Sequence, residues 1–169
     1  MEKMEVLRQY FGFSSFREGQ QTLIDAVLAG RDVLGVMPTG GGKSLCYELP
    51  ALLLPGLTLV ISPLISLMKD QVMALQNAGI PAGCIHSAMS VEELLEAYRD
   101  TRFGAYKILY IAPERLLTDG FCALAQELEI SLLAVDEAHC ISQWGQDFRP
   151  SYLKILDFLQ KLPRRPALA

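Results

Sequence analysis

The chain has 169 residues, of which 51% are hydrophobic, and its formal net charge is −4. This length suits a single domain, and this hydrophobic content suits a sheet that is covered on both faces. The sequence has no run of about 18 apolar residues and its acidic start does not resemble a signal peptide, so we expect no membrane partner and a cytoplasmic protein, or a nucleoid-associated one in a bacterium. The acidic balance on its own argues mildly against a nucleic-acid partner.

Apolar periodicity predicts helices that alternate with strands. In chain order we expect a helix over 18–28, a strand over 32–36, a helix over 45–52 that contains Pro50, a strand over 57–61, a helix over 64–78, a strand over 82–85, a helix over 91–101, a strand over 107–111, a helix over 120–128, a strand over 132–135 and a helix over 152–162. This alternation predicts an α/β fold with a mostly parallel, doubly wound central sheet and helices on both faces.

The cysteines lie far apart in the sequence and form no Cys-x-x-Cys pair. Such spacing favours reduced thiols over disulfides or zinc ligands. The four residues are Cys46, Cys84, Cys122 and Cys140.

The glycine-rich segment 37–44 has the composition of a phosphate-binding loop. Consecutive glycines let backbone N–H groups turn toward an anion, the following lysine adds a positive charge, and the serine hydroxyl can ligate Mg²⁺. The strand expected before the loop and the helix expected after it are the usual context, and the helix N-terminus adds a partial positive charge. Met37 departs from the usual pattern, and a simple glycine-rich turn is the alternative interpretation. The predicted phosphate-binding residues are Thr39, Gly40, Gly41, Gly42, Lys43 and Ser44, of which Ser44 is also a predicted metal ligand.

An acidic pair follows the strand expected over 132–135. A buried parallel strand delivers the residues after it to the carboxyl edge of the sheet, where nucleotides bind in open α/β folds. Asp136 is therefore a candidate Mg²⁺ ligand, and Glu137 is a candidate general base for the attacking water. Acidic residues are also common at helix N-termini, so the pair taken alone admits a structural interpretation.

Five segments, at 11–20, 39–44, 62–71, 111–116 and 136–145, resemble the motifs of the RecQ family of superfamily-2, DEAH-box DNA helicases. Met37 is ordinary in that family. The resemblance implies a three-layer RecA-like P-loop NTPase domain over residues 1–169, with ATP and Mg²⁺ as cofactors. It also implies an ATP-binding motor of a 3′–5′ helicase that couples ATP hydrolysis to DNA unwinding in repair and recombination.

The resemblance implies that the first of these segments binds adenine. Gln20 can offer the amide acceptor and donors that the N6/N7 edge of adenine needs. In the family, the residues that match Phe13 and Arg17 sandwich the base. The alternative for Phe13 and Phe16 is a place in the hydrophobic core.

The segment 144–150 resembles the family's aromatic-rich loop, which links DNA binding to hydrolysis. Bases stack on aromatic side chains with about 1–3 kcal/mol each, which is enough to reorder a short loop. The alternative is that Trp144, the only tryptophan, fills a gap in the core, and Gln146 stands where close relatives often have histidine. The residues expected to bind DNA or to couple it to hydrolysis are Ser66, Lys69, Arg115, His139, Trp144, Phe148 and Arg149.

The expected partners are single-stranded and partly duplex DNA and a second RecA-like domain of the same parent chain. Because that domain completes the ATP site in the family, these 169 residues are expected to carry half an active site and little or no activity alone. Two alternatives remain. An RNA-directed DEAD/DEAH helicase is disfavoured by the segment 144–149, and a non-catalytic nucleotide-binding module is disfavoured by the presence of Lys43, Asp136 and Glu137.

Overall fold

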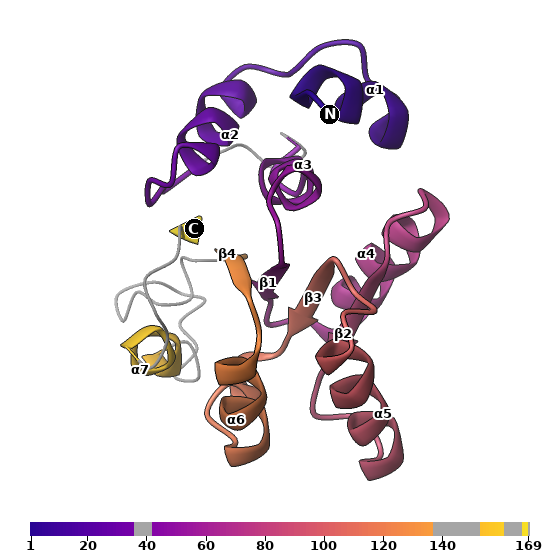
Figure 1. Cartoon of the computed structure of the whole chain (residues 1–169), viewed down its shortest axis with the longest axis vertical. Helices are drawn as coiled ribbons and strands as arrows, with labels where there is room; N and C mark the ends of the chain where they lie inside the picture. The colour runs from indigo at the N-terminus through magenta and orange to yellow at the C-terminus, as the bar shows by residue number, and fades with distance from the viewer. Residues whose placement is uncertain (36–41, 137–152, 161–166, 169) are drawn as a thin grey trace.

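The computed structural model describes residues 1–35, 42–136, 153–160 and 167–168 (Figure 1). Within these residues, five parallel strands form one sheet in the order β2-β3-β1-β4-β5. Parallel neighbours need long crossover connections, and helices supply them here. The strands are β1 (Leu57–Ile61), β2 (Ala82–Ile85), β3 (Ile108–Ile111), β4 (Ile130–Val135) and β5 (Ala167–Leu168).

Helices cover both faces of this sheet, which gives the predicted three-layer α/β architecture. One face packs against α5, α6 and α7, and the other packs against α3 and α4 with part of α2. In Figure 1, α1 and α2 lie beyond α3, on the side away from α5 and α6. The helices are α1 (Lys3–Phe11), α2 (Gln20–Leu28), α3 (Leu45–Leu53), α4 (Ile65–Asn77), α5 (Val91–Arg102), α6 (Asp119–Glu127) and α7 (Leu153–Gln160), with a 3₁₀ turn, η1 (Pro113–Arg115).

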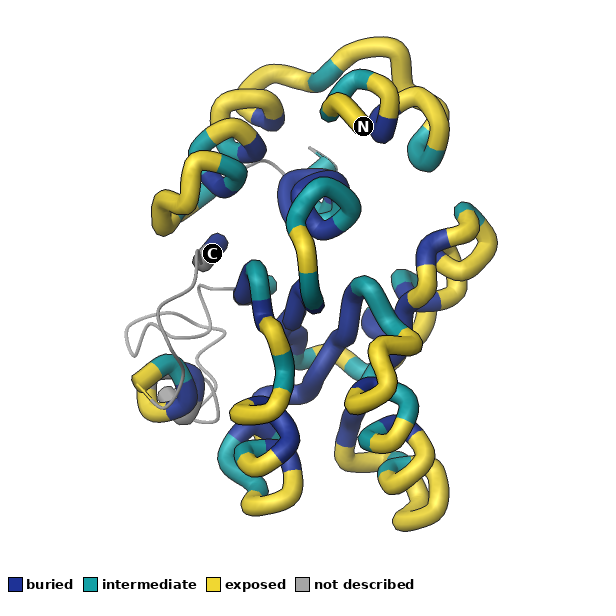
Figure 2. The backbone as a smooth tube through the Cα atoms, in the orientation of Figure 1, coloured by how far each residue is buried: buried dark blue, intermediate teal, exposed yellow. Residues whose placement is uncertain are grey.

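The central strands are buried along their whole length, as Figure 2 shows. Alternate side chains of β1 enter opposite layers, so that Leu59 packs with α5, α6 and α7 while Val60 packs with α3 and α4. A strand that is buried on both faces needs a continuous apolar run, which is the pattern these segments have. Each fully buried side chain of this size contributes about 1.5–3 kcal/mol.

Helix α3 begins directly after the phosphate-loop residues. The carbonyl of Lys43 accepts the N–H of Cys46 at 3.0 Å, and the carbonyl of Ser44 accepts the N–H of Glu48 at 2.9 Å. Pro50 lies inside the helix, as expected, and the helix continues to Leu53. Buried side chains of α1 and α2 pack against α3, so the N-terminal helices hold the element that carries the loop.

The strand predicted over 32–36 is wrong in the part that the structure describes. Val33 forms one isolated parallel bridge with Leu168, and Leu34 is 73% exposed. Among the described residues, the neighbour of this segment is β5 (Ala167–Leu168), and the bridge to Leu168 is the pairing that the structure shows there.

Periodicity also does not predict α1, although its local signals are present. Glu2 and Glu5 form a capping box at its start, and Gly12 ends it in the left-handed conformation, at φ 72°. These are the ordinary start and stop signals of a helix. Every other predicted helix and strand occurs within about two residues of its expected bounds, a usual scatter.

The structure bears on the expectations about the cysteines and about membrane-spanning segments. Cys46, Cys84 and Cys122 form no disulfide among the described residues, and Cys140 lies outside them. Within the same ranges, no helix combines the length and apolar character needed to cross a membrane.

Candidate nucleotide-binding site

Gly42 ends the phosphate loop in a conformation that favours glycine. Its φ is 76°, and a Cβ built there would lie 2.3 Å from Nε2 of Gln20. Any side chain at this position would therefore be strained by the backbone and would collide with a buried amide. Glycine is what allows the loop to approach the first turn of α2 this closely.

Gln20 connects the segment expected to bind adenine to the phosphate loop. Its side chain is buried; Oε1 accepts the N–H of Arg17 at 2.7 Å, and Nε2 donates to the carbonyl of Gly42 at 3.0 Å. An amide has two donor hydrogens and two acceptor lone pairs, so these two contacts leave one of each for a ligand. The structure thus brings together Arg17, Gln20 and Gly42, three of the residues predicted to bind nucleotide.

The two phenylalanines of this segment have different environments. Phe13 is 50% exposed, so the core alternative is wrong for this residue. Phe16 is partly buried and packs against the cluster formed by α1, α2 and α3, so the core alternative holds for it. Only the first ring has a face that a base could stack on.

Asp136 lies at the carboxyl end of β4, beside the end of β1. Its N–H donates to the carbonyl of Ile61 at 2.9 Å, which continues the ladder between the two strands. Burial, and then neighbouring charges that include Asp136, raises the pKa of both Tyr47 and Glu48. The carboxylate therefore lies close to the first turns of α3, which begin at the phosphate loop.

Glu48 is a feature of the site that the sequence analysis missed. Burial, together with the negative charge of Asp136, raises the pKa of this carboxyl group to about 7. A charged residue inside the apolar run of α3 was the available signal. Near neutral pH, a substantial fraction of Glu48 is therefore uncharged in the folded protein.

A chain of hydrogen bonds leads from the core to Ser44. The hydroxyl of Tyr47 lies 3.0 Å from the hydroxyl of Tyr110 and donates to Oε1 of Gln71 at 2.8 Å. Nε2 of Gln71 donates to Oγ of Ser44 at 3.5 Å. The sequence analysis also missed this group, because its members come from α3, β3 and α4 and share no motif.

The described residues fit ATP with Mg²⁺ in their chemistry. Lys43 is exposed at the start of α3, where the helix adds its own partial positive charge toward phosphate. The Ser44 hydroxyl and the Asp136 carboxylate are oxygen ligands, which Mg²⁺ prefers, and this ion commonly takes few protein ligands beside the phosphates. A glycine at position 42 leaves room for the Gln20 amide, which lies where a Cβ would stand.

Three of the residues expected to contact DNA gather at the carboxyl edge of the sheet. Ser66 and Lys69 are exposed on α4, which follows β1, and Arg115 lies in η1, which follows β3. The pKa of His86, after β2, is lowered by burial and by the positive charges of Lys69 and Arg115, so both cations lie near it. Sequence reasoning missed His86, for which a lone polar residue after an apolar strand was the only signal.

The other predicted site residues lie outside the described part of the chain, and their roles stay predictions. They are Thr39, Gly40, Gly41, Glu137, His139, Trp144, Phe148 and Arg149.

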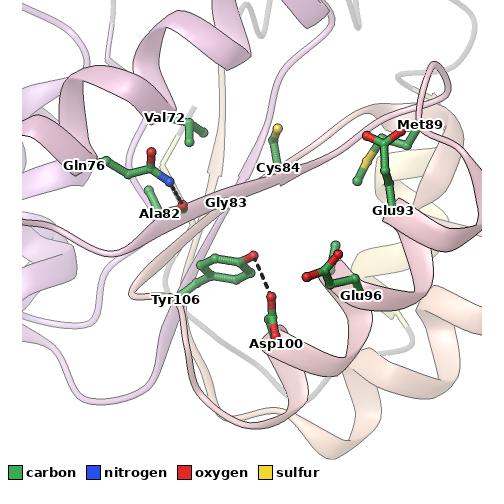
Figure 3. Close-up of a pocket in the computed structure, with 11 residues that line it drawn as sticks. Val72, Gln76, Ala82, Gly83, Cys84, Met89, Glu93, Glu96, Asp100 and Tyr106 are labelled. Atoms are coloured by element: carbon green, nitrogen blue, oxygen red, sulfur yellow. Dashed lines mark hydrogen bonds between the residues drawn. The ribbon is translucent and has the colours of Figure 1, made fainter.

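A separate cavity of about 320 Å³ lies between α4, β2 and α5 (Figure 3). On one wall, Nε2 of Gln76 donates to the carbonyl of Ala82 at 3.0 Å; on another, the hydroxyl of Tyr106 donates to Asp100 at 3.4 Å. None of the residues predicted to bind nucleotide or DNA lines this cavity. Gln76 therefore belongs to a different environment from Gln71, although both are on α4.

The parallel sheet, the glycine before Lys43 and Ser44, and the acid at the end of a neighbouring strand together define a P-loop nucleotide-binding domain. Within that class, the chain belongs to the DEAD/DEAH box helicase family, whose sequence profile matches residues 17–168.

Within this family, the chain is most informatively compared with curated proteins that are named RecQ helicases. The chain is 51% identical over 164 residues to the ATP-dependent DNA helicase RecQ of Bacillus subtilis and 48% identical over 166 residues to that of Haemophilus influenzae. The alignments cover 96% and 98% of this chain but 28% and 27% of those relatives, so the chain spans little more than a quarter of their length. The resemblance to RecQ helicases that the motifs predict is confirmed.

Solved structures confirm the fold. A hypothetical ATP-dependent RNA helicase from Sulfolobus tokodaii matches with a TM-score of 0.75 at 22% identity, over 98% of this chain and 48% of that one. The helicase MrfA bound to DNA and AMPPNP matches with a TM-score of 0.71 at 18% identity, over 99% of this chain and 25% of that one. At such identities the likeness shows the RecA-like α/β fold alone.

Proposed function

We propose that residues 1–169 form the first RecA-like domain of a RecQ-type DNA helicase and serve as its ATP-binding motor domain. In this proposal the parent protein unwinds DNA in the 3′–5′ direction with energy from ATP hydrolysis. The second RecA-like domain of the parent chain closes on the nucleotide, so the domain alone has little activity.

The observation that carries this proposal is the contact of Gln20 with both Arg17 and the Gly42 carbonyl. It sets a buried amide, which can read adenine, beside the end of a loop that can hold phosphates. The exposed ring of Phe13 belongs to the same segment and can stack on the base. A generic glycine-rich turn needs none of these neighbours.

The proposed catalytic roles follow from position and chemistry. Lys43 holds the terminal phosphates, together with the backbone of Thr39, Gly40, Gly41 and Gly42. Ser44 and Asp136 hold Mg²⁺, which neutralises phosphate charge when bound, and Glu137 orients and deprotonates the attacking water.

The proposed nucleic-acid partner is single-stranded or partly duplex DNA. Ser66, Lys69 and Arg115 contact its backbone along the carboxyl edge, which explains how an acidic chain can bind DNA without a basic surface overall. His139, Trp144, Phe148 and Arg149 couple that contact to hydrolysis. We place the parent protein in the cytoplasm, or at the nucleoid of a bacterium. Competition between DNA and RNA for binding tests this choice of partner.

Replacing Lys43 with alanine tests the phosphate-binding assignment. The change removes a charge-assisted contact of about 1.5–3 kcal/mol, so the affinity for ATP should fall about tenfold or more. Calorimetric titration of the purified chain with ATP and Mg²⁺ measures the effect. Lys3→Ala is the matched control, because Lys3 pairs with Asp25 on the N-terminal helices and not with the loop. Equal ATP affinity in wild type and Lys43→Ala would contradict the assignment.

A further inference from the structure

Gln71 joins two functions that the proposed site otherwise keeps apart. Its side chain reaches Oγ of Ser44, the proposed metal ligand, at 3.5 Å. Its backbone belongs to α4, which also carries Ser66 and Lys69, the proposed DNA contacts. A helix moves as a rigid element, so a displacement of α4 on DNA binding would be transmitted to Ser44 through the Gln71 amide.

In the structure, the contact with Tyr47 and the contact with Ser44 use opposite ends of the Gln71 amide. The hydroxyl of Tyr47 donates to Oε1 of Gln71, and its oxygen lies 3.0 Å from the hydroxyl of Tyr110, which also hydrogen-bonds the Glu48 carboxyl group. Both rings are buried, at 4% and 0% exposure. With Oε1 engaged by a donor, Nε2 is the end that is directed at Ser44.

The orientation of the Gln71 amide determines how the Ser44 hydroxyl can bind a cation. An N–H that donates to Oγ occupies one lone pair and leaves the other for a cation. A water molecule at the same place could donate as well, but it would not be tied to α4. The 3.5 Å separation is long for a hydrogen bond, and such contacts often tighten when a ligand arrives.

We propose that Gln71 is a positioning residue that orients the Ser44 hydroxyl for Mg²⁺ and thereby links metal-dependent nucleotide binding to the DNA-contacting helix α4. This inference rests on the proposed function and deepens it. In this series of hydrogen bonds, the buried Tyr47 and Tyr110 stay in place, and Gln71 moves with α4.

The test measures ADP binding by calorimetry with Mg²⁺ and with EDTA, in the 169-residue chain. In Gln71→Leu, ADP affinity in EDTA should stay as in wild type, while the gain on adding Mg²⁺ should shrink by about fivefold. Gln76→Leu is the matched control, because Gln76 is on the same helix and bonds Ala82 beside the separate cavity (Figure 3). It should keep the full gain.

Tyr47→Phe supplies a second, smaller change, which removes only the hydroxyl that holds the amide. It should reduce the Mg²⁺ gain in the same way, and the double variant should be no worse than Gln71→Leu, because the two residues act in one chain. The affinity of wild type for single-stranded DNA should change when Mg²⁺ and ADP are added, and that linkage should weaken in both variants but not in Gln76→Leu.

Outcomes separate this inference from the proposed function. An unchanged Mg²⁺ gain in both Gln71→Leu and Tyr47→Phe would overturn the role of Gln71 while leaving the nucleotide site intact. Loss of ADP affinity in EDTA to the same extent as with Mg²⁺ would also overturn it, because the role would then be structural. A wild-type chain that binds no nucleotide would overturn the proposed function itself.

Discussion

Glu48 is a carboxyl group whose folded-state environment opposes its charge. Burial and the charge of Asp136 raise its pKa from 4.5 to about 7. The folded protein therefore binds this proton more tightly than the unfolded chain does, and stability is lost as the pH rises through that window. From the size of the pKa shift, the unfolding free energy changes by at most about 3 kcal/mol across this window.

Replacing Glu48 with glutamine should remove this pH dependence, because the amide stays neutral. The variant should match wild type at about pH 4.5 and exceed it by about 1–3 kcal/mol at about pH 8. Urea unfolding without nucleotide, at both pH values, measures the difference. Glu92→Gln, at an exposed position in the first turn of α5, is the control and should show little of it. A variant no more stable than wild type at the higher pH would refute the burial argument.

At this scale, sequence alone identifies the residues that carry chemistry and misses those that orient them. The residues Lys43, Ser44 and Asp136 are predictable because a loop composition and a strand end mark them. Gln71 lies at the end of the motif segment 62–71, but neither it nor Tyr110 carries a pattern that indicates contact with the phosphate loop. Their relation to Ser44 exists only after α3, α4 and β3 have packed together, and no local pattern encodes that packing.

At the scale of elements, α5 shows how a surface helix is fixed at its start. The Oγ atom of Ser90 accepts the N–H of Glu93 at 3.1 Å, and the carboxylate of Glu93 accepts the N–H of Ser90 at 3.4 Å. The pair satisfies two backbone donors that would otherwise lack partners at the helix end. Acidic residues in the first turn and arginines in the last also suit the helix dipole.

Replacing Ser90 with alanine should cost about 0.5–2 kcal/mol of unfolding free energy. Thermal or urea unfolding of the purified chain measures this loss. Ser87→Ala is the matched control, since Ser87 is exposed in the preceding turn and outside the helix. Equal stability of the two variants would mean that the cap contributes nothing in this protein.

Elements with a clear apolar pattern are the ones that the sequence predicts well, whereas α1 was missed although its start and stop signals are present. The bounds of β1 and β2 agree with the prediction, and those of α5 differ by one residue. The predicted strand over 32–36 failed for a different reason. The pairing that the structure shows for that segment is with Leu168, which is distant in sequence, and periodicity carries no information about such a neighbour.

At the scale of the whole molecule, Leu168 joins parts of the fold that are distant in sequence. It bridges Val33, pairs with Ala134 of β4 and is 6% exposed in the cluster that contains Tyr47. The segment that leads into the phosphate loop is therefore attached to the sheet through this residue.

Replacing Leu168 with alanine should lower the unfolding free energy by about 2–5 kcal/mol, because a buried leucine is lost and a cavity remains. Urea unfolding measures the loss. The control is Leu95→Ala, since Leu95 is 61% exposed on α5 and should matter by less than about 0.5 kcal/mol. Equal losses in the two variants would show that Leu168 does not hold the sheet.

The bridge between Val33 and Leu168 also sets an order of events during synthesis. A ribosome adds about 5–20 residues per second, so the segment before the phosphate loop emerges on the order of ten seconds ahead of its partner. In that interval Val33 lacks this bridge, and closing so long a span of chain is slow. The segment before the phosphate loop is thus made early and gains its bridge to β5 late, while the packing of α1 and α2 on α3 is available much sooner.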